Sequence, residues 1–82
     1  MRVINFTLYS KEIHQDGTEI TIYPNGDRYY WLGSVRHRLD GPAVSFIALD
    51  GALIEEWHYN GLRIDVKNQK DFERYLNLLA FI

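Results

Sequence analysis

Hydrophobic and polar residues alternate along most of the chain, and only the last stretch has a helical period. In the segment 18–23, Ile20 and Ile22 alternate with Glu19 and Thr21, which is the two-residue period of a strand with one buried face. The stretch from Phe72 has apolar residues at helical spacing, and Asn68 stands where an N-cap is expected. The pattern predicts a strand-rich fold that ends in a helix over about residues 69–81.

Gly-containing turns divide the strand-like part of the chain. Asn25-Gly26 and Asp50-Gly51 are typical tips of tight hairpins, because Gly readily takes the positive φ that these turns need. The flanking segments then form two hairpins, 18–23 with 28–32 and 43–49 with 53–59, and residues 3–9 give a further strand. We therefore predict an α+β fold: one domain over residues 1–82, with an antiparallel β-meander of about five strands and a C-terminal helix that covers one sheet face.

The outgoing strands of the two hairpins carry similar aromatic pairs, Tyr29 with Trp31 and Trp57 with Tyr59. Because the pair is present in both hairpins, we predict that it faces the core together with Ile20 and Ile22. Alternation then places four other side chains on the outer face, namely Arg28, Tyr30, Glu56 and His58.

Two segments, 14–36 and 37–65, have a similar order of turn and aromatic residues, which indicates an internal repeat. The second contains His37-Arg38-Leu39-Asp40-Gly41-Pro42-Ala43, followed by Asp50-Gly51, a Trp-x-Tyr strand and Asn60-Gly61. This segment resembles the His-Arg-x-Asp-Gly-Pro-Ala repeat proteins of phages and large DNA viruses, which are similar to membrane occupation and recognition nexus (MORN) repeats. Residues 14–33 match less well, since Gln15 and Thr18-Glu19 replace Arg and Pro-Ala. The resemblance implies a small phage accessory protein that binds and inhibits a host or defence protein in the host cytoplasm.

The resemblance does not extend to membrane association, because the chain lacks the His-Gly-x-Gly element and the long arrays of MORN proteins proper. Composition agrees with a cytoplasmic protein that has no membrane partner: there is no cysteine and no long apolar run. The formal net charge is −2, so nucleic acid is not an expected partner. We predict no cofactor.

Polar residues of the repeat form the densest candidate for chemistry. His37 and Asp40 could act as an acid–base pair, but an Asp before a Gly-Pro turn commonly accepts backbone hydrogen bonds, and a recurring motif favours a scaffold role. The scaffold signature comprises His37, Arg38, Asp40, Gly41, Pro42, Gly51, Trp57 and Gly61. The three histidines, His14, His37 and His58, lack the spacing of a zinc site, so no metal is predicted.

The leading hypothesis is a non-enzymatic protein-interaction module, since Tyr, Trp and Arg are enriched at interface hot spots. The predicted binding residues are Tyr23, Arg28, Tyr30, Arg36, Glu56 and His58. A protein that binds or sequesters a nucleotide or nucleic acid is the alternative, because the same aromatic and basic residues could stack bases. A small enzyme that uses His37 and Asp40 is a minor alternative. Exposed hairpin edges leave a homodimer open.

Overall fold

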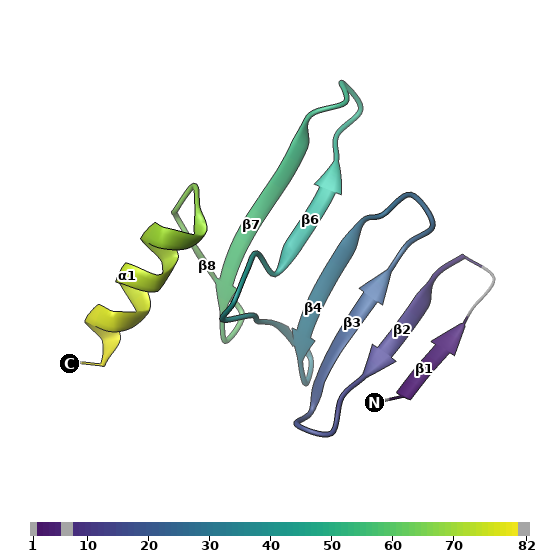
Figure 1. Cartoon of the computed structure of the whole chain (residues 1–82), viewed down its shortest axis with the longest axis horizontal. Coiled ribbons are helices and arrows are strands. Elements are labelled where there is room, and N and C mark those ends of the chain that lie inside the picture. The colour runs from purple at the N-terminus through teal and green to yellow at the C-terminus, as the bar shows by residue number, and fades with distance from the viewer. Residues whose placement is uncertain (1, 6–7, 81–82) are drawn as a thin grey trace.

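The protein forms one antiparallel sheet followed by a helix (Figure 1). The structure, a computed structural model, describes residues 2–5 and 8–80. Its elements are β1 (Arg2–Asn5), β2 (Ser10–Ile13), β3 (Thr18–Ile22), β4 (Arg28–Leu32), β5 (Val35–Arg36), β6 (Val44–Ile47), β7 (Leu53–Tyr59), β8 (Leu62–Ile64) and α1 (Gln69–Leu79). The strand order is β1-β2-β3-β4-β6-β7-β8, with β5 paired to β4. The α+β class, the antiparallel meander and the C-terminal helix are thus confirmed. Residue 81, at the end of the predicted helix, lies outside the described residues.

Eight strands are present within the described residues, so the prediction of about five was too low. The predicted tips at Gly26 and Gly51 have φ values of 95° and 88°. Three further turns were not recognised as hairpin connections: Asp16-Gly17, Gly33-Ser34 and Asn60-Gly61. Residues 3–9 also do not form one strand, because β1 ends at Asn5 and β2 begins at Ser10; residues 6–7 lie outside the described part.

Three of the hairpin turns are held by the same local hydrogen bond. In each, a side-chain oxygen of Asp or Asn accepts the backbone N–H of the residue two positions later, across an intervening Gly with positive φ. The bonds run to Asp16 from Thr18 (3.0 Å), to Asn25 from Asp27 (3.0 Å) and to Asp50 from Ala52 (2.9 Å). The turns are therefore specified locally, by residue type.

The strand register places the two aromatic pairs on opposite faces of the sheet. Tyr29 of β4 lies opposite Val44 of β6, and Val44 lies opposite Glu56 of β7. Directly paired residues share a face, so Tyr29 and Trp31 lie on the side of Glu56, whereas Trp57 and Tyr59 lie on the other. The prediction that both pairs face one core was therefore wrong: a difference of one residue in register exchanges the faces of a strand.

The buried core lies where the helix meets β7 and β8. Trp57, Ile64 and Phe72 are 3%, 8% and 0% exposed, and half-buried apolar side chains surround them: Tyr59, Val66, Tyr75 and Leu76. The helix is positioned by its predicted N-cap, since the Asn68 side chain accepts the Asp71 backbone N–H at 2.9 Å. The Trp57 indole N–H also donates to the Gln69 side chain at 2.8 Å.

The helix lies beside β8 at one end of the sheet, and β1–β4 have no helix over them (Figure 1). The prediction that the helix covers a face of the whole sheet was therefore wrong. The shortest dimension of the molecule is 17 Å, which fits a single layer of strands with side chains on both sides. In consequence Ile20 and Ile22, predicted to be core residues, are only half-buried.

Stability is expected to depend on the small core at the helix. Phe72→Ala removes the completely buried ring and should lower the free energy of unfolding by roughly 3–5 kcal/mol. Leu78→Ala, on the same helix but 63% exposed, is the matched control and should cost less than about 1 kcal/mol. Urea denaturation followed by circular dichroism measures both. Equal losses for the two variants would contradict this location of the core.

Candidate functional site

A short backbone segment, 36–38, joins the two halves of the sheet. The Arg36 carbonyl accepts the Gly61 N–H at 2.8 Å, and the Arg38 N–H donates to the His58 carbonyl at 3.3 Å. On the other side, the His37 N–H donates to the Tyr30 carbonyl at 3.1 Å. The segment therefore lies between β4 and the end of β7, and its two arginines reach rings on opposite faces of β4.

One face of the sheet carries a connected group of aromatic side chains, which we call the aromatic face: Tyr23, Tyr29, Trp31 and Arg36. The rings of Tyr23 and Tyr29 meet edge to face with centroids 5.8 Å apart. The Arg36 guanidinium lies 5.4 Å from the Tyr29 ring centroid and 5.5 Å from that of Trp31. These side chains border a shallow hollow of about 500 Å³.

The aromatic face is held in place by hydrogen bonding and by the register of the strands. Thr21 lies opposite Tyr29, and its hydroxyl accepts the Trp31 indole N–H at 3.2 Å. This bond fixes the ring orientation of Trp31 and satisfies its only polar atom. The rings thus form a preorganised surface, which costs little side-chain entropy when a ligand binds.

Some of the described charged side chains around the hollow form ion pairs, and one of them does not. Lys11 and Glu19 line it and form an ion pair with each other at 3.5 Å. Glu56, further along the same side of the sheet, contacts His58 Nε2 at 3.2 Å. Among the described residues, Arg36 has no carboxylate within ion-pair distance and makes no side-chain hydrogen bond. It contributes one unneutralised positive charge to the aromatic face.

The opposite face carries the other arginine, and its surroundings differ. Arg38 lies 4.0 Å from the Tyr30 ring centroid, donates to the Asp40 carboxylate at 2.8 Å and donates to the Pro42 carbonyl at 3.3 Å. A Cβ on Gly41 would come within 2.5 Å of the guanidinium carbon, so Gly at this position leaves room for Arg38. The bond from Arg38 holds the pKa of Asp40 below its usual value of 3.8.

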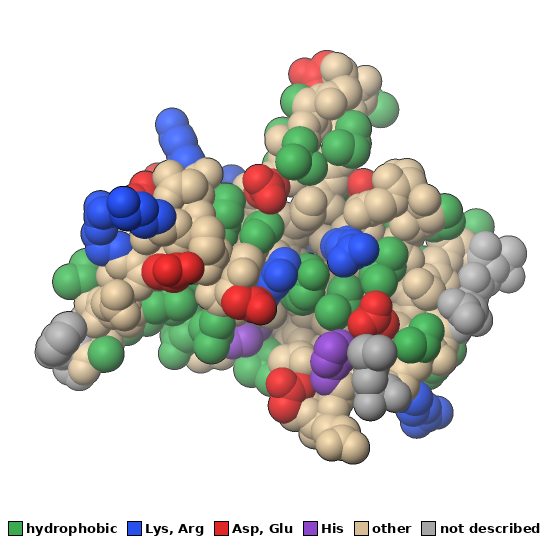
Figure 2. All heavy atoms as spheres, in the orientation of Figure 1, with side chains coloured by type: hydrophobic (Ala, Val, Ile, Leu, Met, Phe, Trp, Pro, Cys, Tyr) green, Lys and Arg blue, Asp and Glu red, His purple; other side chains and the backbone are tan. Residues whose placement is uncertain are grey.

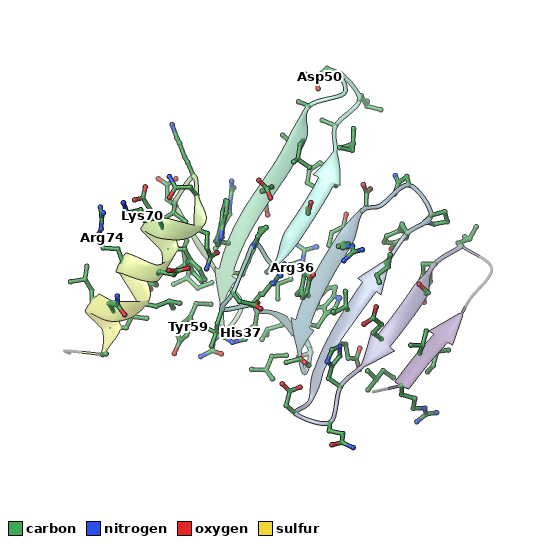
Figure 3. The ribbon with its side chains drawn as sticks, in the orientation of Figure 1. Arg36, His37, Asp50, Tyr59, Lys70 and Arg74 are labelled. Atoms are coloured by element: carbon green, nitrogen blue, oxygen red, sulfur yellow. The ribbon has the colours of Figure 1, made fainter. Side chains whose placement is uncertain are left out.

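His37 connects two turns of the sheet. Its Nδ1 accepts the Asn60 backbone N–H at 2.8 Å, and its ring lies 5.4 Å from that of Tyr59, as the neighbouring labels in Figure 3 show. Asp40 bonds to Arg38 instead, so the described residues do not hold His37 and Asp40 as a hydrogen-bonded pair. The predicted partner of Asp40, a backbone N–H, is replaced by this arginine. Gly61, also in the signature, has φ 87° in the adjoining turn.

Both Asp-Gly elements of the repeat border one hollow on this opposite face. Its volume is about 570 Å³, and its lining includes His14 and Asp16 from the first half of the chain and His37 and Asp40 from the second. The pKa of Asp16 is lowered, mainly because the Thr18 hydroxyl donates to its carboxylate. The two similar segments thus meet in space, although their matching residues are more than 20 positions apart in the sequence.

The structure divides the predicted binding residues between the two faces. Tyr23, Arg36, Glu56 and His58 lie on the side of the aromatic face, and Arg28 and Tyr30 lie on the other. His58 is only 6% exposed, so its predicted outward position was wrong. Tyr29 and Trp31 were assigned to the core and so were missed. The run Tyr29-Tyr30-Trp31 contained the signal, because consecutive aromatic residues in a strand must occupy both faces.

Comparison with protein-family models, with curated proteins and with solved structures finds no match to this chain. The resemblance to the phage repeat proteins therefore stays a prediction. Within residues 2–5 and 8–80, no group of three or more His, Cys, Asp or Glu is placed to hold a metal ion. In that same part of the chain, no helix is both long and apolar enough to cross a membrane.

The Arg38–Asp40 pair should make stability depend on acid pH. The folded-state pKa of Asp40 is lowered, so its contribution is present above pH 3.8 and is lost as the pH falls through the folded-state value. The carboxylate is exposed, so the effect should not exceed about 1 kcal/mol. Asp40→Asn keeps an oxygen acceptor but removes the charge. The difference in unfolding free energy between wild type and variant should be largest at pH 7 and shrink toward pH 2; an unchanged difference would contradict this role.

Proposed function

We propose that this chain is a non-enzymatic protein-interaction module of the cytoplasm, and that it binds its partner through the aromatic face. The observation that carries the proposal is the open side of β2–β5, where Tyr23, Tyr29, Trp31 and Arg36 form one connected surface. Figure 2 shows one face of the molecule, on which hydrophobic side chains lie interspersed with charged ones.

The residue types on the aromatic face are those that contribute most to protein binding. Tyr, Trp and Arg dominate interface hot spots: Tyr and Trp have large contact areas with only two side-chain torsions, and Arg has a planar fork of hydrogen-bond donors. Tyr23 is already 37% exposed, whereas Tyr29 and Trp31 are half-buried at the floor of the hollow. A partner that fills the hollow would bury these rings without a rearrangement of the sheet.

The nucleotide or nucleic-acid alternative uses the same rings but has less support. Binding a phosphate backbone requires several unneutralised cations close together. Of the two described cations that line the hollow, Lys11 is paired with Glu19 and Arg36 has no carboxylate partner. The more specific role, inhibition of a host or defence protein, depends on the resemblance to phage repeat proteins and is proposed on that ground alone.

Two neighbouring tyrosines provide a matched test of this function. Tyr29 and Tyr30 are consecutive in β4, half-buried, and on opposite faces of the sheet. The tagged chain is used to capture proteins from a lysate of the cells that naturally express it, and bound proteins are quantified by mass spectrometry. A partner bound by wild type should be lost by at least about tenfold in Tyr29→Ala and retained in Tyr30→Ala.

Circular dichroism and melting curves of both variants must show folded protein before capture is compared. Loss of the partner with Tyr30→Ala alone would move the binding site to the opposite face and reject the proposal. Salt-sensitive recovery of oligonucleotides in place of a protein would favour the nucleic-acid alternative.

A further inference from the structure

The two arginines of the 36–38 segment differ in one respect that concerns ligand binding. Both guanidinium groups lie against aromatic rings, Arg38 at 4.0 Å from Tyr30 and Arg36 at 5.4 Å and 5.5 Å from Tyr29 and Trp31. Arg38 also has a carboxylate, Asp40, at 2.8 Å. Arg36 has none among the described residues, although it is half-buried.

An unpaired, half-buried guanidinium has unused capacity for hydrogen bonds. The group carries five N–H donors in a planar fork that matches the two oxygens of a carboxylate. The two ring contacts are not hydrogen bonds, and among the described residues no group accepts the N–H donors of Arg36, so these donors are available to a ligand. A carboxylate at that edge would make charge-assisted hydrogen bonds, which are stronger than neutral ones, in a partly dehydrated site.

The surrounding charges favour an anionic group at this one position. Lys11 and Glu19 both line the hollow and neutralise each other at 3.5 Å, so the residual charge among its described lining residues is that of Arg36. The chain as a whole is negative, with a formal net charge of −2. The net charge therefore gives an acidic ligand no general attraction to the surface, and Arg36 gives it a preferred position.

We infer that the aromatic face is a receptor for an acidic–aromatic segment of a protein partner: a carboxylate of the partner binds the edge of Arg36, and an adjacent ring or apolar side chain packs on Tyr29 and Trp31. This inference rests on the proposed function and names the chemistry of the partner. A carboxylate fits better than a phosphate, because its single charge matches one cation, and of the two described cations that line the hollow Lys11 is already paired with Glu19.

Small probes test the inference on the intact protein. Phenylacetate carries a ring and a carboxylate, whereas phenylacetamide has the same shape without the charge; adenosine monophosphate represents the nucleotide alternative. Each is titrated by nitrogen–proton NMR, observing the Trp31 indole N–H and the Arg36 Nε–H. The Trp57 indole, which donates to Gln69, and the Arg38 Nε–H, which donates to Asp40, are internal controls.

Phenylacetate should shift the Trp31 and Arg36 signals saturably and bind at least about fivefold more tightly than phenylacetamide, because only the charged probe can use the guanidinium edge. The Trp57 and Arg38 signals should stay in place. Equal affinity for the two probes, or no saturable shift by phenylacetate, would overturn the inference. Tighter binding of adenosine monophosphate than of phenylacetate would overturn it in favour of a nucleotide ligand.

Two charge variants separate this site from a general effect of charge. Arg36→Gln should abolish the preference for phenylacetate, whereas Arg28→Gln, which changes the net charge equally on the opposite face, should preserve it. If Arg36→Gln does not fold, Arg36→Lys is used: it keeps the charge but lacks the planar fork, so the preference should fall by about half or more. Retention of the full preference in the Arg36 variant would overturn the inference.

The outcome is distinguishable from failure of the proposed function. If capture of a protein depends on Tyr29 while the probes show no carboxylate preference, the interaction module stands and the acidic partner is rejected. If capture does not depend on Tyr29, the proposed function itself fails, whatever the probes show.

Discussion

The backbone bridge at residues 36–38 is the constraint on which the rest of the structure depends. It donates to the Tyr30 carbonyl on one side and bonds to His58 and Gly61 on the other, so it joins the first four strands to the last two. Besides this bridge, the halves meet through the short pairing of β4 with β6, the backbone of Ala43 and a hydrogen bond from the Ile47 N–H to the Asp27 carboxylate. The same three residues also supply the side chains of both candidate surfaces, so fold and recognition share one element.

A single-layer sheet explains why so much of this small protein remains available for binding. Its helix buries only the end formed by β7 and β8, where Trp57, Ile64 and Phe72 make the core. The other strands are stabilised by ladder hydrogen bonds, by local turns and by cross-strand ring contacts, each worth about 1 kcal/mol or less. The rings that pack in this way on β4, and that of Tyr23 just after β3, are therefore also the rings that a partner can reach.

Local features of the fold were predictable from sequence, and long-range ones were not. The helix start at Asn68, the turns at Gly26 and Gly51 and the antiparallel class follow from residues close together in the chain. The face of Tyr29 depends on its pairing with Val44, which no local pattern specifies. Arg38 pairs with Asp40, two residues away, whereas Arg36 has no carboxylate partner among the described residues. The candidate residues could be named from local sequence patterns, but assigning each of them to one face of the sheet required the register of the paired strands.

The different surroundings of Arg36 and Arg38 give a physical reason to assign Arg38 to the scaffold and Arg36 to ligand binding. The charge of a guanidinium that is already paired with a carboxylate is largely neutralised, so Arg38 has less to gain from an anionic ligand than Arg36 has. Arg36 contacts two rings and makes no side-chain hydrogen bond among the described residues, so binding a carboxylate there adds hydrogen bonds and breaks none. The distinction depends on Asp40. Its carboxylate pairs with Arg38, the arginine of the repeat signature, and leaves Arg36 available to a partner.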